Sequence, residues 1–83
     1  MTTDELKNLA IHKTIDARGT ACPGPLLAAK KAIGEIDSGQ IMEVLSSDEG
    51  TKEDIPKWCQ KMSHKMLGII DEDSFSRLFL EKA

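Results

Sequence analysis

The chain has 83 residues, which is enough for one small domain. Of these residues 40% are hydrophobic, so a modest core can form without a framework of disulfides. Eleven Lys and Arg residues against 14 Asp and Glu residues give a net charge of −3, which opposes non-specific binding to nucleic acid. The amino terminus lacks the basic and apolar regions of a signal peptide, and no apolar run approaches the roughly 18 residues of a membrane span. We therefore expect a cytoplasmic protein that contacts neither nucleic acid nor membrane directly.

The first part of the chain divides into a lead-in and the start of a domain. Residues 1–10 are mostly polar, and Leu6 and Leu9 indicate no more than a frayed turn. We expect a single domain over residues 11–83. Alternation from 11 to 17 predicts a strand with Ile11, Ile15 and Ala17 on one face. Residues 18–21 then form a loop.

A helix is predicted from Pro23 to about Ile36, because apolar residues recur at 26, 29, 33 and 36 and so share one face. Proline is favoured at the first helical position, where its missing N–H would have had no partner. This makes Cys22 the capping residue. The turn at 37–39 ends the helix, and residues 40–46 form an interior strand.

The second helix is predicted from about Pro56 to Lys65, after a loop at 47–50 and a tight turn at 51–55, because proline interrupts a helix begun earlier. Its apolar stripe consists of Ile55, Trp58, Cys59, Met62 and Met66. Strands at 67–72 and 75–81 follow and form an antiparallel hairpin. The order βαβαββ implies an α/β (α+β) two-layer sandwich, with the first crossover parallel and right-handed.

Cys22 is the main candidate for chemistry. The positive end of a helix dipole lowers the pKa of a thiol from about 8.5 to roughly 7–8, which leaves a sizeable thiolate fraction at neutral pH. The alternative is a small hydrophobic residue packed in a tight turn, since free cysteine is commonly buried. The residues alone leave both interpretations open.

Two blocks of sequence carry a resemblance. The first is Asp16-Ala17-Arg18-Gly19, followed after two residues by Cys22-Pro23-Gly24-Pro25-Leu26-Leu27, and the second runs from Asp48 to Cys59. Together they resemble the signature of the TusA/SirA-like sulfur-carrier family, over nearly the whole chain from Ile11. The resemblance implies a mixed four-stranded sheet with both helices on one face.

The resemblance also implies a function. In such carriers the cysteine that matches Cys22 receives sulfane sulfur as a persulfide from a donor of the cysteine desulfurase or rhodanese type and passes it to an acceptor protein. This sulfurtransferase activity implies no cofactor and no metal, and we expect a monomer. The alternative is a regulatory or adaptor module that binds a protein partner through the same surface without sulfur chemistry.

The residues around Cys22 are expected to support it. Asp16 orients the loop through backbone hydrogen bonds, and Gly19 permits a positive φ. Arg18 is either a group that reaches the thiol or its persulfide, or an ordinary exposed arginine. Pro23, Gly24 and Pro25 shape the helix terminus, and Gly24 leaves the approach to Cys22 open. In the second block, Asp48 and Asp54 are expected to serve capping and loop geometry.

Two positions depart from the resemblance. Residue 21 is Ala where the carrier devoted to tRNA thiolation has a basic residue, and residue 24 is Gly where that carrier has an acidic one. Both lie in the segment that a partner would contact. They leave open which donor and which acceptor this chain serves.

The remaining candidates have simpler interpretations. Cys59 lies on the apolar stripe and is expected to be buried and inert. His12 should face outward from the first strand, and His64 should lie in the last turn of the second helix; neither has a second ligand at metal spacing. Lys30 and Lys31 are too far along the helix to activate the thiol. They are either a docking site for an acidic partner or a solvated face.

Overall fold

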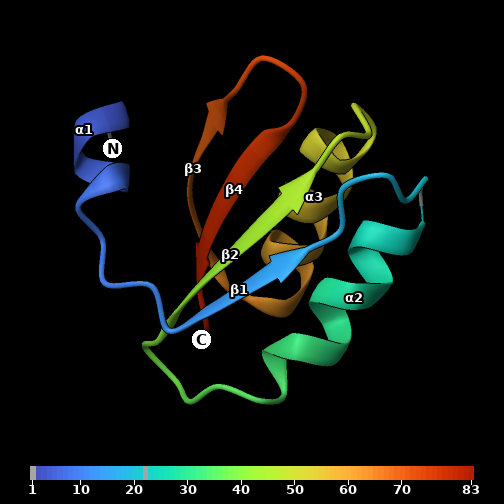
Figure 1. The fold of residues 1–83 in the computed structure, drawn as a ribbon. Coiled ribbons are helices and arrows are strands. Elements are labelled where there is room, and N and C mark those ends of the chain that lie inside the picture. The colour runs from blue at the N-terminus through green and yellow to red at the C-terminus, as the bar shows by residue number, and fades with distance from the viewer. Residues whose placement is uncertain (1, 22) are drawn as a thin grey trace.

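The fold is seen in a computed structural model that describes residues 2–21 and 23–83 (Figure 1). The elements in chain order are α1 (Thr3–Lys7), β1 (Lys13–Asp16), α2 (Gly24–Ile33), β2 (Ile41–Ser46), α3 (Thr51–Met62), β3 (Lys65–Asp71) and β4 (Ser76–Glu81).

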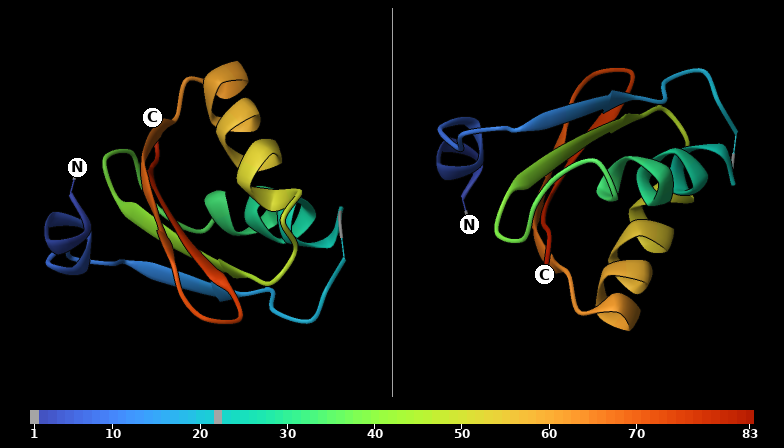
Figure 2. Two further views of the ribbon diagram at one scale, coloured as in Figure 1. Left: turned by 90° about the horizontal axis from the view of Figure 1, so that it is seen from above. Right: turned by 90° about the horizontal axis from the view of Figure 1, so that it is seen from below.

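The four strands form one mixed sheet in the order β1-β2-β4-β3. β1 and β2 run parallel, as the crossover through α2 requires, and both β2–β4 and β3–β4 are antiparallel. Helices α2 and α3 cover the same face of the sheet (Figure 2). The predicted architecture, including the hairpin and the interior position of β2, is therefore confirmed.

The main core lies between this helical layer and the sheet. The sheet contributes residues that alternate along the two central strands, as expected for one buried face. The core cluster consists of Ala29, Ala32, Ile36, Met42, Val44, Ile55, Trp58, Cys59, Leu78 and Leu80. Of the two central strands, β2 packs against α2 and β4 packs against α3.

The opposite face of the sheet carries a second, smaller core under α1. The expected frayed turn is instead a capped helix, in which Thr2 and Glu5 form a capping box. Leu6 is 2% exposed and packs with Leu67, Ile70 and Phe79. Burial of this side chain gives a five-residue helix the stability that its length does not provide.

The beginning of the first strand also differs from the prediction. β1 starts at Lys13, and Ile11 packs against the smaller cluster, whereas Ile15 packs against the main core. Placing both residues on one face was therefore wrong. His12 lies just before the strand, where its Nδ1 accepts a hydrogen bond of 3.1 Å from the Ile41 N–H.

Helix α2 is shorter at both ends than predicted. Pro23 is its N-cap and Gly24 its first residue, so the prediction that the helix begins at Pro23 behind a Cys22 cap was wrong by one position. The helix ends at Ile33. Ile36 is nevertheless buried, from the turn that follows.

Helix α3 begins at Thr51 and continues through Pro56, so the predicted turn at 51–55 was wrong. Thr51 is buried, and its hydroxyl lies 2.8 Å from the Ser46 hydroxyl. Proline removes one backbone hydrogen bond, worth about 0.5–1.5 kcal/mol, and the complete burial of Ile55 offsets that loss.

The end of α3 explains two further differences. Ser63 has a φ of 65° and terminates the helix after Met62, so His64 lies beyond the helix and not in its last turn. Met62 is 53% exposed instead of buried. Met66 belongs to β3 and packs against the main core from there.

Candidate functional site

Cys22 lies outside the described residues, so the site is defined by the segments that lead to it and away from it. Residues 17–21 connect β1 to α2 at the carboxyl end of the first strand. The carboxyl ends of parallel strands meet at one edge of a sheet. The residues that follow β2 are therefore neighbours of this loop.

The β1–α2 loop is fastened to that edge by backbone hydrogen bonds. Ala17 N–H donates to the Leu45 carbonyl at 2.8 Å, and Gly19 N–H donates to Ser47 Oγ at 2.9 Å. Gly19 has the expected positive φ, +79°, a conformation that L side chains rarely adopt. The loop thus has a defined path up to Ala21.

Asp16 holds Arg18 in place. Its Oδ1 accepts from the Arg18 backbone N–H at 3.2 Å, as expected, and its carboxylate also accepts from Nε at 2.9 Å and Nη2 at 2.8 Å. These hydrogen bonds lower the pKa of Asp16 to about 2. The guanidinium also lies 4.9 Å from the centre of the Phe75 ring. Its charge is therefore engaged with a carboxylate at the end of β1.

The start of α2 offers fewer hydrogen-bond donors than a typical helix terminus. Gly24 N–H donates to the Ala21 carbonyl at 2.8 Å, and Pro25 has no N–H. A Cβ at position 24 would stand 2.1 Å from Thr20 Cγ2. Gly24 therefore lets the loop and the helix approach each other. The dipole of α2 remains as a source of positive potential at this end.

The loop between β2 and α3 forms the other wall of the site. Asp48 shapes it as predicted: its backbone N–H donates to Ser46 Oγ at 3.1 Å, and its Oδ1 accepts from the Gly50 N–H at 3.0 Å. A hollow of about 350 Å³ lies between the two loops and is lined by Gly19, Thr20, Ala21, Ser47 and Asp48.

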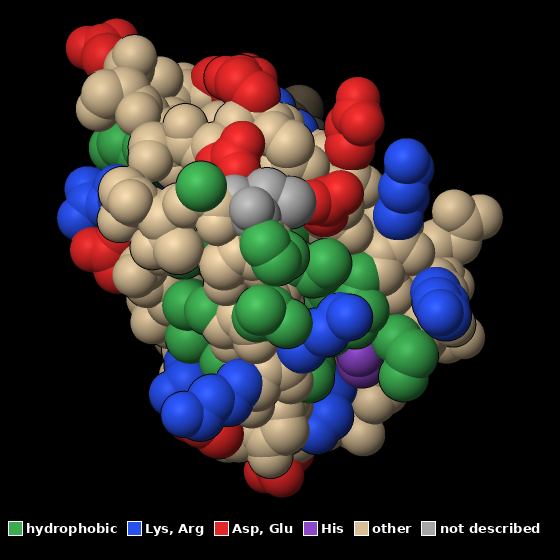
Figure 3. Space-filling model, turned by 90° about the vertical axis from the view of Figure 1, so that its right-hand side faces the viewer, with side chains coloured by type: hydrophobic (Ala, Val, Ile, Leu, Met, Phe, Trp, Pro, Cys, Tyr) green, Lys and Arg blue, Asp and Glu red, His purple; other side chains and the backbone are tan. Residues whose placement is uncertain are grey.

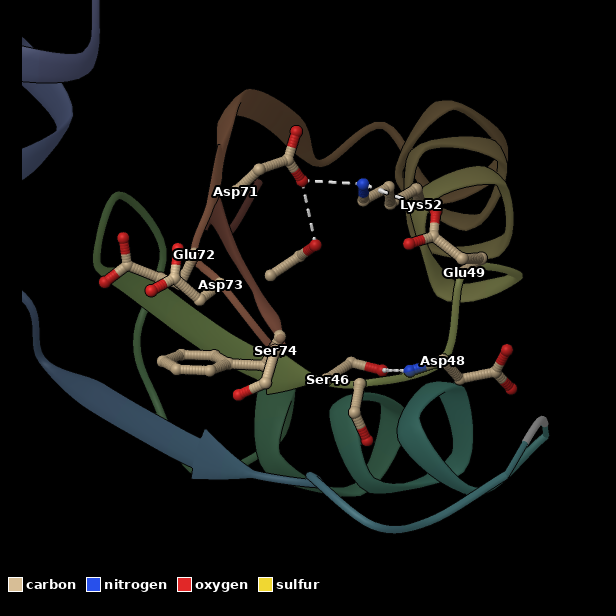
Figure 4. Close-up of a pocket in the computed structure, with 11 residues that line it drawn as sticks. Ser46, Asp48, Glu49, Lys52, Asp71, Glu72, Asp73 and Ser74 are labelled. Carbon is tan, nitrogen blue, oxygen red and sulfur yellow. Dashed lines mark hydrogen bonds and ion pairs between the residues drawn. The ribbon is translucent and has the colours of Figure 1, made fainter.

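A second hollow of about 320 Å³ adjoins it across Ser47 and Asp48 and extends to the β3–β4 turn (Figure 4). Lys52 reaches across this hollow to Asp71 at 2.6 Å, and Ser76 Oγ donates to the same carboxylate at 2.9 Å. Both contacts lower the pKa of Asp71. Lys52 and Asp71 satisfy each other, so this pair ties α3 to the hairpin.

Cys59 is a structural residue. Its side chain is 1% exposed within the main core, and burial raises the pKa of its thiol to about 11. Such a thiol is neither accessible nor ionised at neutral pH. The prediction that Cys59 is buried is confirmed.

The other candidates lie away from the loop. Lys30 and Lys31 are both exposed on α2. The His64 ring packs edge-on against Trp58, with 5.2 Å between ring centroids, and its Nδ1 accepts from the Ala83 N–H. The described residues include no group of three or more His, Cys, Asp and Glu side chains that could hold a metal ion. Among the helices that they form, none has the length and apolarity needed to cross a bilayer.

Three residues of the site were not found from the sequence. Ser47 could have been predicted, because it directly follows β2, and the residues that follow two neighbouring parallel strands lie at the same edge of the sheet. Thr20 lies against Gly24, and this contact can be predicted only when the path of the loop is known. Phe75 contacts Arg18 because the β3–β4 hairpin turns back beside β2, and this depends on the strand order.

Comparison with known proteins identifies the family. The family model described as Sulfurtransferase TusA matches residues 13–82. The chain belongs to the TusA sulfurtransferase family. It is 40% identical over 68 residues to a proposed sulfur carrier protein of Archaeoglobus fulgidus, with 82% of this chain and 93% of the relative covered. It is 37% identical over 67 residues to the sulfur carrier protein TusA of Pseudomonas entomophila, with 81% and 84% covered.

A solved structure supports the same assignment. The crystal structure of a SirA-like protein from Desulfitobacterium hafniense superimposes with a TM-score of 0.75 at 27% identity, and 83% of this chain and 95% of that chain are covered. The resemblance to TusA/SirA-like proteins is thereby confirmed. The family model begins at β1, so α1 lies outside the matched residues.

Proposed function

We propose that this TusA-family chain is a sulfur carrier that holds sulfane sulfur as a persulfide on Cys22, in the cytoplasm. It takes the sulfur from a donor protein of the cysteine desulfurase or rhodanese type and passes it to the thiol of an acceptor protein. The relatives named as sulfur carriers support the general role.

The observation that carries the assignment to Cys22 is the burial of the other cysteine. Cys59 is 1% exposed, and its raised pKa keeps it protonated. A carrier needs a thiolate that two partners reach in turn. Of the two cysteines in the chain, Cys59 does not meet this requirement.

The proposed transfer involves no net oxidation. The Cys22 thiolate attacks the terminal sulfur of the donor persulfide, R–S–SH, forming one S–S bond as the donor S–S bond breaks. The donor leaves as the thiolate R–S⁻, and Cys22 becomes Cys22–S–SH. Delivery repeats the exchange with the acceptor thiolate as nucleophile. Atoms and charge balance without a metal or an organic cofactor.

The surrounding residues support this exchange in stated ways. Asp16 and Gly19 define the path of the loop, and Pro23, Gly24 and Pro25 begin the helix whose dipole favours a thiolate or a persulfide anion. Arg18 is paired with Asp16, so its role is to hold the loop rather than to supply an unpaired charge. Lys30, which lines the hollows between α2 and α3, is the candidate for contact with a partner.

Intact-mass spectrometry tests the proposal. Wild-type protein incubated with inorganic polysulfide should gain one sulfur atom, about 32 Da, which reductant removes. Cys59→Ala should gain the same mass, and Cys22→Ser should gain none. Failure of the wild-type protein to load from polysulfide, and from a desulfurase or rhodanese charged with sulfur, would support an adaptor role instead.

A further inference from the structure

A groove runs between α2 and α3 on the outer surface of the helical layer. It consists of two adjoining hollows, of about 350 and 230 Å³, which share Lys30, Trp58 and Lys61. Lys57 and Asp54 line the hollow nearer the beginning of α3, and His64 lines the other. We call this feature the α2–α3 groove.

The floor of the α2–α3 groove is apolar. Leu26, Ile33, Trp58 and Met62 contribute to it, and Met62 is 53% exposed although it carries a large hydrophobic side chain. In Figure 3, hydrophobic side chains gather on this face of the molecule, with Lys and Arg side chains among and around them and a histidine at the edge. An exposed apolar area within a polar rim is typical of a protein interaction site.

The rim of the groove is positively charged on a chain whose net charge is −3. Lys30, Lys57 and Lys61 contribute three cations, against one carboxylate, that of Asp54. Within the described part of the chain, none of these ammonium groups forms an ion pair. In contrast, Lys13 is paired with Glu35 and Lys52 with Asp71. The lysines of the groove are thus available to an incoming carboxylate.

We infer that the α2–α3 groove binds an acidic segment of the sulfur donor, with an apolar side chain on the Trp58–Met62 floor and carboxylates on Lys30 and Lys61. This inference rests on the proposed function for the identity of the partner. The groove starts at Leu26, four residues after Cys22 in the sequence, so a partner bound there is close to the transfer site. Charge complementarity decides between partners, because it favours acidic segments and rejects basic ones.

Lys31 provides a matched control. It follows Lys30 directly and is also exposed, but it does not line the groove, because successive helical residues point about 100° apart. A protein segment is also favoured over a lipid surface. A flat bilayer contacts only protruding apolar side chains such as Met62, whereas the Trp58 side chain, the largest in the groove, is only 8% exposed.

Trp58 makes binding directly measurable, since it is the single tryptophan of the chain. The probe is a twelve-residue amphipathic peptide of Glu, Leu and Ala, compared with a counterpart that has Lys in place of Glu. We expect the acidic peptide to shift the Trp58 fluorescence and its indole N–H resonance, and the basic peptide to leave both unchanged. Lys30→Glu with Lys61→Glu should weaken acidic-peptide binding about tenfold. Lys7→Glu with Lys31→Glu, which changes the net charge equally, should weaken it less than twofold.

Three results would overturn the inference: no binding of the acidic peptide at millimolar concentration, equal weakening in both double variants, or a Trp58 response to anionic vesicles but not to the peptide. Sulfur loading separates this inference from the proposed function. Groove variants should load normally from polysulfide, whereas their KM for a charged donor protein should rise with kcat unchanged. If the wild-type protein binds the peptide but never loads sulfur, the proposed function is wrong, whereas the acidic-segment site in the α2–α3 groove is supported.

Discussion

At the residue scale, the pairing of Arg18 decides which group favours the Cys22 thiolate. Its guanidinium donates to Asp16 at two points and lies against Phe75. A cation whose charge is largely neutralised by an adjacent carboxylate has little effect on a third group in an exposed loop. We therefore expect the dipole of α2 to be the main influence on the thiol.

Arg18→Ala should therefore lower the thiolate fraction of Cys22 only slightly, with a pKa increase of less than about one unit. The rate of alkylation against pH, in a Cys59→Ala background, measures this shift. Lys31→Ala serves as a control for the loss of one positive charge. An increase of a full unit or more would assign the activation to Arg18.

The raised pKa of the buried Cys59 thiol predicts that the free energy of unfolding depends on pH. Burial raises the pKa of its thiol to about 11 in the folded chain, whereas the unfolded chain ionises near 8.5. The stabilisation is fully present below about pH 8.5 and is lost as the pH rises toward 11, because only the unfolded state releases the proton there. Urea unfolding should show this decrease in wild type, and it should be smaller in Cys59→Ala.

The Cys59→Ala variant should be less stable than wild type by roughly 1 kcal/mol at pH 7, because the substitution leaves a small cavity in the core. It should still load sulfur. Rapid labelling of Cys59 by a thiol reagent under native conditions would contradict this account.

At the scale of single elements, the start of α2 depends on the contact between Thr20 and Gly24. Alanine is the better helix former by about 1 kcal/mol, but a Cβ at position 24 would clash with Thr20 Cγ2. We predict that Gly24→Ala destabilises the protein by roughly 1 kcal/mol and that Thr20→Ser, which lacks Cγ2, reverses the effect. Denaturant unfolding of the two single variants and the double variant tests this. Equal effects of Gly24→Ala in both backgrounds would exclude the clash.

Helix α1 depends on one side chain. Leu6 packs on the outer face of the sheet, where a Cβ at Gly68 would stand 2.8 Å from its Cδ1. Leu6→Ala should cost at least about 2 kcal/mol, whereas exposed Lys7→Ala should change stability by less than about 0.5 kcal/mol. Thermal unfolding distinguishes the two. A Leu6→Ala protein as stable as wild type would mean that α1 is not anchored to the sheet.

Elements with a strong local pattern could be predicted from the sequence, and those set by distant contacts could not. The alternation around Ile15 and the stripe at Ile55, Trp58 and Cys59 gave the correct elements. The start of α3 was missed because Pro56 is a strong local signal for a break. It is outweighed by burial of Thr51 and Ile55 against the sheet.

At the scale of the whole molecule, the strand order explains which contacts of the site could not be predicted from the sequence. The β1-β2-β4-β3 order places the hairpin turn beside the β1–α2 loop, so that Phe75 meets Arg18 across 57 positions of sequence. No local pattern encodes that contact. The hydrogen bond from the Arg18 N–H to Asp16 and the positive φ of Gly19 were predictable, since both are local to the turn after β1.

The central claim is that Cys22 both accepts and releases one sulfur atom while Cys59 takes no part. The most direct measurement loads wild-type protein with polysulfide, removes the donor, and follows peptide-resolved mass before and after cyanide, which converts sulfane sulfur to thiocyanate. We predict one added sulfur on the peptide that contains Cys22, none on the peptide that contains Cys59, and one equivalent of thiocyanate with return to the original mass. Sulfur on the Cys59 peptide, or on neither, would contradict the account.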